Sequence, residues 1–315
     1  MSLMVAAAAA FLASQYDTPV LLIALLLGMS AAFLAENPAS RPGIEFAAGP
    51  VLRCGVALLG LRVAFGDLVA LGGFTVTVLA VAASITIGGG ILLAKVLKLD
   101  KSFGALSGGA VAICGVSAAI AISSVMPRSK AMDQHLAVTI VTVTVFGSLA
   151  MVFYPALVQF AGFDTLTAAV FLGASIHDVS HVVGAGYSVS PEVGDLAVLT
   201  KMIRVVMLVP VVWGFFWVYH SRATAASGGG KWPLPWFLIL FVALAVIASF
   251  EIVPNAILRA ADGASRWLLV VAIAALGMKT SLRALLATGW RPVLLVFGES
   301  TLLGALVLAW TGGFL

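Results

Sequence analysis

The chain has 315 residues, of which 62% are hydrophobic and only 10% are charged. Soluble globular proteins are about half apolar and about a quarter charged, so no soluble core could hide this much apolar surface. Lipid tolerates it, and the composition therefore predicts an all-α polytopic membrane protein whose partner is the lipid bilayer. The net charge of +4 is spread over short loops without a basic stripe, which excludes nucleic acid as a partner and agrees weakly with an anionic substrate.

Apolar segments of about 20 residues, the length that crosses a bilayer as a helix, recur along the whole chain. They predict about ten spans in a single transporter domain, residues 1–315, with an Ala-rich stretch at 1–14 as a partial eleventh. The predicted spans lie near residues 18–35, 45–63, 69–97, 101–125, 132–160, 164–187, 195–219, 233–251, 258–280 and 291–313.

Lys and Arg residues gather on one side of these spans, which predicts the orientation in a bacterial inner membrane because cytoplasmic loops carry the excess of positive charge. The side expected to be cytoplasmic carries Arg41, Lys95, Lys98, Lys101, Arg222, Lys231, Arg283 and Arg291. The other side carries Arg62, Arg128, Lys130 and Arg259. Arg128 and Lys130, in the loop after the fourth predicted span, run against this rule.

The first three spans, near 18–97, are echoed by the last three, near 233–313. The segment Ala57–Arg62 (ALLGLR) recurs as Ala274–Lys279 (AALGMK), with prolines in register before each copy. Seven predicted crossings separate equivalent spans, so the two copies face opposite ways. An inverted repeat of this kind is typical of secondary transporters. Chance similarity among Leu-, Ala- and Gly-rich helices is the alternative.

A weaker echo joins the middle of the chain. The segment Ala112–Ser117 resembles Ser175–Ser180, and each is followed downstream by the tripeptide Leu-Ala-Val. The span count gives both copies the same direction. A strict inverted repeat would need an extra or a re-entrant crossing here, and the sequence leaves that choice open.

Glycines and hydroxyls interrupt the apolar span near 101–125. Such clusters mark unwound helices whose backbone N–H groups face an ion or a substrate, since a helix N-terminus attracts an anion without a charged side chain. We expect a broken helix here; a helix face packed through small residues is the alternative. The candidate binding residues are Ser107, Gly109, Cys114, Gly115 and Ser117.

The string His177-Asp178-Val179-Ser180-His181 puts ionisable groups inside the span predicted near 164–187. Such groups are costly in lipid and usually functional. A helix would place the two histidines on one face, where they could exchange protons with help from Asp178, and Ser180 joins the candidate site. A polar loop end is the alternative. The spacing is also one step from the zinc-protease motif H-E-x-x-H, which makes an intramembrane metalloprotease a remote alternative.

Lys201 and Arg204 share one helix face inside an apolar span. Two buried cations need compensation, which Asp178, Asp195 or a bound anion could supply. A structural ion pair and a direct substrate contact are both open.

Four further charged positions lie in or at the ends of apolar runs. Arg53 and Glu299 also lie deep in apolar runs and could pair with one another or line a pathway. Lys279 and its repeat counterpart Arg62 sit at span ends, where snorkelling to the interface is the simpler interpretation. The two cysteines are too few for a disulfide framework or a Cys-based zinc site, and no metal or cofactor is predicted.

These motifs resemble the YeiH-type family of bacterial membrane proteins, whose members are described as sulfate exporters. The resemblance spans nearly the whole chain, and its specific elements are the Ile-Cys-Gly and Ser-Ile-His strings. The segments that carry it are Arg41–Ile44, Leu58–Arg62, Ala112–Ala118, Phe146–Gly147, Tyr154–Pro155, Ser175–Val179, Lys201 with Arg204, Pro235–Phe237 and Ala274–Gly277. The chain departs from the family at His177–His181, where H-E-V-A-Q is usual, and at Val116, where I-C-G-A-S is usual.

The resemblance implies a fold like that of cation–proton antiporters and bile-acid symporters, with a panel, a core and discontinuous crossing helices. It also implies export of sulfate or a related oxyanion. We therefore expect a transporter and not an enzyme, moving a small anion with H+ or Na+ as the coupling ion, and a homodimer is open as its assembly. Sodium-coupled symport of an organic anion and a passive anion channel are the alternative functions.

Overall fold

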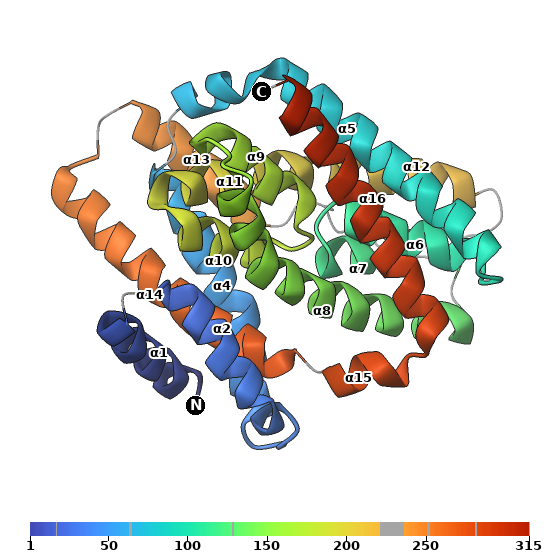
Figure 1. Ribbon diagram of the computed structural model, residues 1–315, viewed down its shortest axis with the longest axis horizontal. Coiled ribbons are helices and arrows are strands. Elements are labelled where there is room, and N and C mark those ends of the chain that lie inside the picture. The colour runs from blue at the N-terminus through green and yellow to red at the C-terminus, as the bar shows by residue number, and fades with distance from the viewer. Residues whose placement is uncertain are drawn as a thin grey trace.

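The computed structural model describes residues 1–16, 18–62, 65–127, 129–220, 236–250, 253–280 and 282–314, and within them it contains helices and no strand (Figure 1). Six helices in these ranges are long and apolar enough to cross a membrane. They are Arg41–Arg62, Thr75–Val96, Lys130–Phe160, Pro191–Tyr219, Asn255–Lys279 and Trp290–Thr311. The predicted all-α polytopic fold is confirmed.

Three predicted spans correspond to shorter apolar helices. The N-terminal stretch forms α1 (Ser2–Tyr16), the next forms α2 (Val20–Ser30) extended by η1 (Ala32–Ala35), and the span near 233–251 forms α13 (Trp236–Ser249). Residues 233–235 and 251 of that prediction lie outside the described residues.

The long helices carry irregular turns where proline interrupts them. The span Arg41–Arg62 is composed of α3 (Arg41–Phe46), η2 (Ala47–Val51), α4 (Leu52–Leu58) and η3 (Leu59–Arg62). Pro50 lies inside the η2 turn, which is a π-type segment, because proline has no N–H for the helical ladder. The span from Pro191 is likewise divided into α11 (Pro191–Val206) and α12 (Leu208–His220) just before Pro210.

The segment predicted as a broken helix is a helical hairpin, which we call hairpin 1. It consists of α6 (Lys101–Ala112) and α7 (Val116–Val125), and a Cβ added to Gly109 near the end of α6 would lie 2.4 Å from the Cδ1 atom of Ile122 in α7. Such a contact requires the two helices to lie side by side. The chain reverses at Gly115, whose φ is +61° and ψ is −122°, a conformation that L side chains rarely adopt.

The second motif forms hairpin 2, which consists of α9 (Thr165–Ser175) and α10 (Val179–Val189). In α10, His181 contacts Gly147 and Gly184 contacts Met151, so α10 runs parallel to α8 (Lys130–Phe160). In contrast, α9 follows α8 after a short turn and runs back along it. The two halves of hairpin 2 are therefore antiparallel.

The two hairpins approach one another from opposite ends of α8. Hairpin 1 is joined to the N-terminal end of α8 by residues 126–129, and hairpin 2 is joined to its C-terminal end by residues 161–164. The broken helix predicted near 101–125 is confirmed, and the re-entrant course that the sequence left open for 164–187 is observed. Both segments were counted as single crossings, which the structure corrects because the chain reverses at each tip. The weak echo between Ala112–Ser117 and Ser175–Ser180 thus relates two re-entrant tips that point in opposite directions.

Re-entry also removes an exception to the charge rule. Because hairpin 1 does not cross, Lys130 at the start of α8 lies at the same end as Lys98 and Lys101, which follow α5 (Phe65–Val96). Arg128, Arg222 and Lys231, also used in that prediction, lie outside the described residues. The prediction that this end is cytoplasmic consequently loses one of its two contrary charges.

One group of helices outside the hairpins forms what we call the panel, which consists of α1, α2, α3 to η3, α13 and α14 (Asn255–Lys279). Within it, Gly28 of α2 and Gly277 of α14 lie against one another's backbone, and a Cβ on Gly28 would come 2.2 Å from the carbonyl oxygen of Ala274. Gly60 packs in the same way on the carbonyl of Phe241 in α13. Close approach through small residues is the usual way in which helices associate in lipid.

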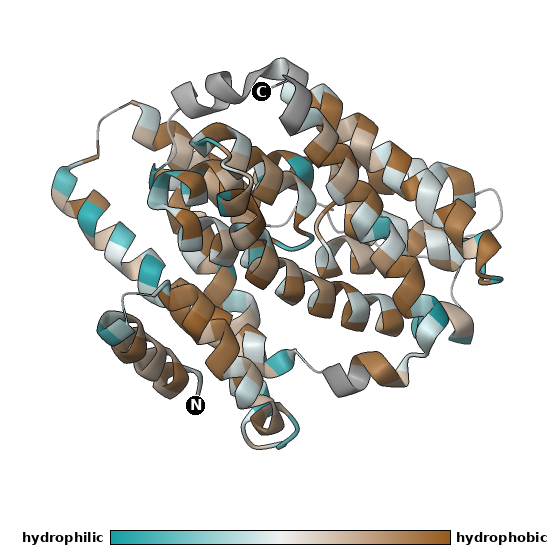
Figure 2. Cartoon of the chain, viewed as in Figure 1, coloured by the Kyte–Doolittle hydropathy of each residue, from teal (hydrophilic) through white to brown (hydrophobic). Residues whose placement is uncertain are grey.

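Large apolar side chains cover the outside of the molecule. Phe160 is 93% exposed and Phe153 on the same helix is 63% exposed. Figure 2 shows apolar residues along α2, α8 and α16 (Trp290–Phe314), with hydrophilic residues concentrated on the first half of α14. Only a surrounding apolar phase accommodates such a surface, so the exposed helix faces contact lipid.

Candidate functional site

The tips of the two hairpins meet at a pair of buried cations on α11. Lys201 and Arg204 are 0% and 1% exposed. The Lys201 Nζ atom donates to the carbonyl oxygens of Ile113 (2.8 Å) and Ile176 (2.7 Å), one in each tip. The guanidinium of Arg204 also donates to both hairpins. Its acceptors are the carbonyl oxygens of Val111, Ala112, Ala174 and Ile176.

These contacts correct the predicted compensation of the two cations. No ion pair among the described residues joins Lys201 or Arg204 to a carboxylate; backbone oxygens at the C-terminal ends of α6 and α9 take that place. The last carbonyls of a helix lack intrahelical partners and carry the negative end of the helix dipole, so cations are stabilised there. The shared helix face predicted for the two residues is confirmed.

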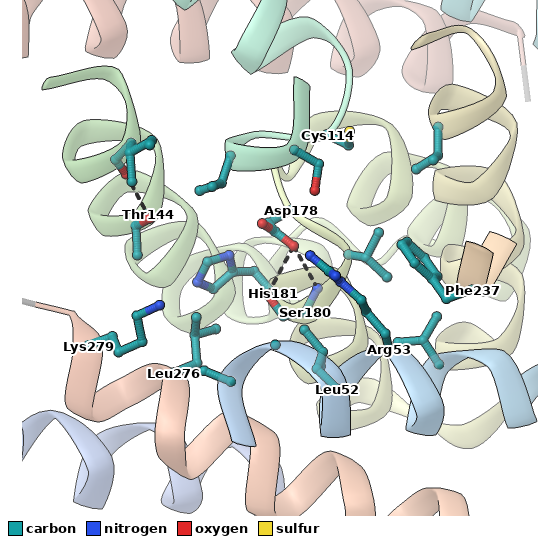
Figure 3. Close-up of a pocket in the computed structure, with 18 of the residues that line it drawn as sticks. Leu52, Arg53, Cys114, Thr144, Asp178, Ser180, His181, Phe237, Leu276 and Lys279 are labelled. Atoms are coloured by element: carbon teal, nitrogen blue, oxygen red, sulfur yellow. Dashed lines mark hydrogen bonds between the residues drawn. The ribbon is translucent and has the colours of Figure 1, made fainter. Parts of the chain in front are cut away.

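A cavity of about 270 Å³ lies on the other side of the tips, between the hairpins, α8 and the panel. Figure 3 shows the tip of hairpin 1 at Cys114 above it and α4 below it. Its lining from the hairpins consists of Cys114, Val116, Ser117, Asp178, Val179, Ser180 and His181. Five of the predicted binding residues, Cys114, Ser117, Asp178, Ser180 and His181, are therefore brought together. Gly115, in the tip of hairpin 1, faces hairpin 2, since a Cβ added to it would lie 3.6 Å from the side chain of Asp178.

The N-terminal ends of α7 and α10 both border this cavity, but they differ. Asp178 accepts hydrogen bonds from the backbone N–H (3.2 Å) and the hydroxyl (3.1 Å) of Ser180, and so caps α10 with its own negative charge. No described side chain caps α7, which begins at Val116 beside the cavity. The first N–H groups of α7 are thus available to an anion.

Two cations from the panel also line the cavity. Figure 3 shows Arg53 extending from α4 towards Asp178, and Lys279 entering from the other side. Between them His181 is joined through its Nε2 atom to Ser148 Oγ (3.1 Å), which contacts Thr280 Oγ1 (3.0 Å). The cavity therefore combines two cations with one carboxylate, an excess of positive charge that favours anions.

Besides Gly115, Lys201 and Arg204, three more predicted site residues do not line the cavity. Ser107 donates to Glu299 (2.7 Å), Gly109 packs on Ile122, and His177 pairs with Ser300 Oγ (2.6 Å). The prediction that His177 and His181 share a helix face is wrong, because α10 begins only at Val179 and His177 lies in the tip. The two histidines consequently contact different helices.

The structure decides between the alternatives left open for Arg53 and Glu299 and places Lys279 differently from the prediction. Arg53 and Glu299 do not pair, since the first lines the cavity and the second contacts hairpin 1. Lys279 is a cavity residue that sequence reasoning assigned to the membrane interface. Its only signal in the sequence was its register with Arg62 in the repeat.

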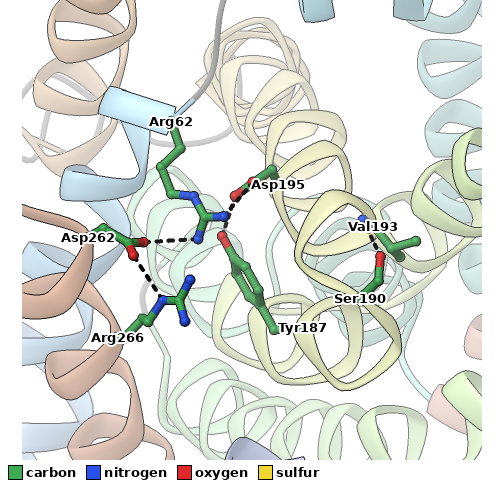
Figure 4. A network of polar contacts seen from close by, with 7 residues as sticks. All are labelled: Arg62, Tyr187, Ser190, Val193, Asp195, Asp262 and Arg266. Carbon is green, nitrogen blue, oxygen red and sulfur yellow. Dashed lines mark hydrogen bonds and ion pairs between the residues drawn. The ribbon is translucent and has the colours of Figure 1, made fainter. Parts of the chain in front are cut away.

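Arg62 joins hairpin 2 and α11 to the panel (Figure 4). Its guanidinium lies 3.1 Å from Asp195 of α11 and 3.1 Å from Asp262 of α14, and over the ring of Tyr187 at 5.6 Å. Tyr187 donates to Asp195, and Arg266 pairs with Asp262 within α14. This ionic link lies at the base of hairpin 2, away from the tip.

Comparison with known proteins places these features in a wider group. The family model of conserved hypothetical protein 698 matches residues 1–296. A UPF0324 membrane protein of Chlorobaculum tepidum is 44% identical over 309 residues, which cover 98% of this chain and 86% of that protein. The UPF0324 membrane protein TauZ of Paracoccus denitrificans is 45% identical over 309 residues, 97% of this chain and 91% of that protein. No solved structure matches the chain.

Proposed function

We propose that this chain, which belongs to the family of conserved hypothetical protein 698 (the UPF0324 membrane proteins), is a secondary transporter of a small anion. The site is the cavity between the hairpin tips and the panel, and the membrane is the bacterial inner membrane. The observation that carries the proposal is the meeting of two re-entrant tips whose C-terminal ends are held by Lys201 and Arg204.

The choice of an anion follows from what faces the cavity. Lys201 and Arg204 neutralise the carbonyl ends of α6 and α9 on the side of the tips away from the cavity. The uncapped N-terminus of α7, in contrast, points towards the cavity. Interaction of an anion with one helix N-terminus contributes about 0.3–1 kcal/mol, so it needs help from side chains. Arg53 and Lys279 supply it. Broken helices that present dipole ends to a substrate are characteristic of secondary transporters.

Alternating access needs a contact that breaks when the hairpins move against the panel. The pairs of Arg62 meet this need together: the pair with Asp195 joins η3 of the panel to α11, and the pair with Asp262, within the panel, holds the guanidinium in place for it. While they hold, the base of hairpin 2 stays closed against the panel. Their release would let the cavity open towards that end of the protein.

The direct test is flux of radiolabelled sulfate in proteoliposomes of the purified protein under an imposed pH gradient. We expect accumulation that follows the gradient and saturates with sulfate. Saturable flux that follows a sodium gradient instead would favour sodium-coupled symport. Unsaturable flux that ignores both gradients would favour a channel, and no flux of sulfate, sulfite or a small organic anion would contradict the proposal.

Replacing Arg53 and Lys279 should weaken anion binding. Each is solvent-accessible, so loss of either charge should cost on the order of 1 kcal/mol, a rise of roughly fivefold in the half-saturating sulfate concentration. Arg53→Gln and Lys279→Gln are measured beside Lys95→Gln, which removes the same charge from an exposed position at the end of α5. An equal effect of all three variants would show that only the net charge matters.

Replacing Arg62 should shift the balance between the two access states. Loss of the part-buried pair with Asp195, which joins the panel to α11, should change the population ratio by about 1 kcal/mol, roughly fivefold. The measurement is the distance distribution between spin labels on the exposed positions Glu192 and Arg259, with both native cysteines replaced by serine. Arg62→Gln should enrich longer distances. Arg266→Gln is the control, because its pair with Asp262 stays within α14.

A further inference from the structure

Neighbouring residues of α16 contact both hairpins. The Oε1 atom of Glu299 accepts a hydrogen bond from Ser107 Oγ in hairpin 1 at 2.7 Å. The next residue, Ser300, lies 2.6 Å from the Nε2 atom of His177 in the tip of hairpin 2. A single turn of α16 thus touches both moving parts from the side opposite the panel.

Glu299 is a buried carboxyl group without a counter-charge among the described residues. It is 1% exposed, and in the part of the chain that the structure describes its Oε2 atom has no hydrogen-bond partner. Gly90 of α5 lies directly against it, since a Cβ there would come 2.4 Å from Oε1. No ion pair within the described ranges includes Glu299. An isolated buried carboxylate costs several kcal/mol, so these surroundings favour the neutral carboxylic acid form of Glu299.

The helices packed on α16 are α5, α6, α8 and α9. The titratable side chains that they and the tip of hairpin 2 bring towards this part of α16 are His177, beside Ser300, and Tyr154, whose hydroxyl lies near Gly304. The charged residues Lys95, Lys101, Lys130, Asp133 and Arg291 belong to the terminal turns of α5, α6, α8 and α16, and His135 of α8 lies beside Asp100. None of these groups pairs with Glu299.

We propose that Glu299 is the binding site of the coupling proton, an inference that rests on the proposed transport function. The carboxylic acid is stable only while Gly90 and Ser107 exclude water from it. When the hairpins move away from α16, water reaches the group, its O–H bond breaks, the proton passes to water and the carboxylate keeps the electron pair. The charged form then needs water, so the closed conformation re-forms only after a proton returns.

The coupling follows from this geometry without direct contact between proton and substrate. Glu299 does not line the cavity, yet its partner Ser107 belongs to the hairpin whose tip does. Proton occupancy therefore selects the position of hairpin 1, and the cavity follows. His177 occupies the corresponding position on hairpin 2 and acts as a positioning residue through Ser300.

The experiment is infrared difference spectroscopy of the full-length protein in lipid, followed by flux. The carbonyl stretch of a buried carboxylic acid should be present at neutral pH and absent in Glu299→Gln. It should persist in Glu192→Gln, which changes an exposed carboxylate at the start of α11, and shift in frequency in Ser107→Ala, which removes the hydrogen bond to Oε1. Monodisperse elution of each variant verifies folding.

The flux arm separates this inference from the transport proposal. In Glu299→Gln we expect loss of sulfate accumulation driven by a pH gradient, with sulfate–sulfate exchange retained. A carboxylic acid band that survives in Glu299→Gln, or pH-driven accumulation equal to that of the wild type, overturns the assignment of the proton. Absence of any anion flux in the wild type contradicts the proposed function instead, and the spectroscopic result on Glu299 still stands.

Discussion

Arg204→Met is expected to destabilise the protein by about 3–5 kcal/mol and to abolish transport. The guanidinium donates to carbonyl oxygens of both hairpins in a fully buried setting. A methionine fills similar space but leaves several helix-terminal carbonyls unpaired, and each buried orphan costs about 1–3 kcal/mol. The measurement is the free energy of unfolding in mixed micelles, together with sulfate flux.

Arg41→Met provides the control for this change. Arg41 makes an exposed pair with Glu45 in the same helical turn at 2.8 Å, and its side chain is 66% exposed. The same substitution there should alter stability by less than about 0.5 kcal/mol. Arg204→Lys keeps the charge and loses donors, so it should fall between the two. Equal stability of Arg204→Met and Arg41→Met would mean that something other than this side chain holds the tips.

Gly115→Ala is expected to remove most transport activity while the protein still folds. At φ +61° and ψ −122° a Cβ atom strains the backbone by about 1–3 kcal/mol, although no atom lies closer than 3.6 Å to its position. Relief of that strain turns the first residues of α7 and so misdirects the N–H groups that face the cavity. Flux and unfolding free energy are measured on the same preparation.

The matched change is Gly263→Ala. Gly263 lies within α14, has no positive φ and no atom within 4 Å of an added Cβ. Alanine is favoured over glycine in a helix by roughly 0.5–1 kcal/mol, so this variant should be as stable as the wild type or slightly more stable. Normal flux in Gly115→Ala would show that the tip tolerates another conformation.

The sequence predicted the helical membrane fold and the discontinuity near 101–125 because hydropathy and glycine placement are local properties. It could not tell a crossing from a hairpin, since 22 to 25 apolar residues satisfy the length criterion whether or not the chain turns back at its middle. The single residue that reverses hairpin 1, Gly115, was recognised as a breaker, but its dihedral angles are set by tertiary contacts.

The candidate site was predicted in part for a similar reason. Residue types identified Asp178, Ser180 and His181 as cavity residues. They could not reveal that Lys201 and Arg204 bind backbone oxygens, because every residue carries a carbonyl and only the fold decides which ones are exposed at a helix end. Lys279 was misjudged since a lysine at the end of a span usually reaches the interface, whereas here the span ends beside the cavity.

The shared grip of Lys201 and Arg204 limits the kinds of motion open to the protein. Neither hairpin can move alone without breaking hydrogen bonds, because Lys201 and Arg204 each donate to carbonyl oxygens of both hairpins. Lys201 and Arg204 thus join α11 and both hairpins into one rigid body. Exposure of the cavity to the opposite compartment therefore requires a displacement of this whole rigid body along the panel, which stays in place.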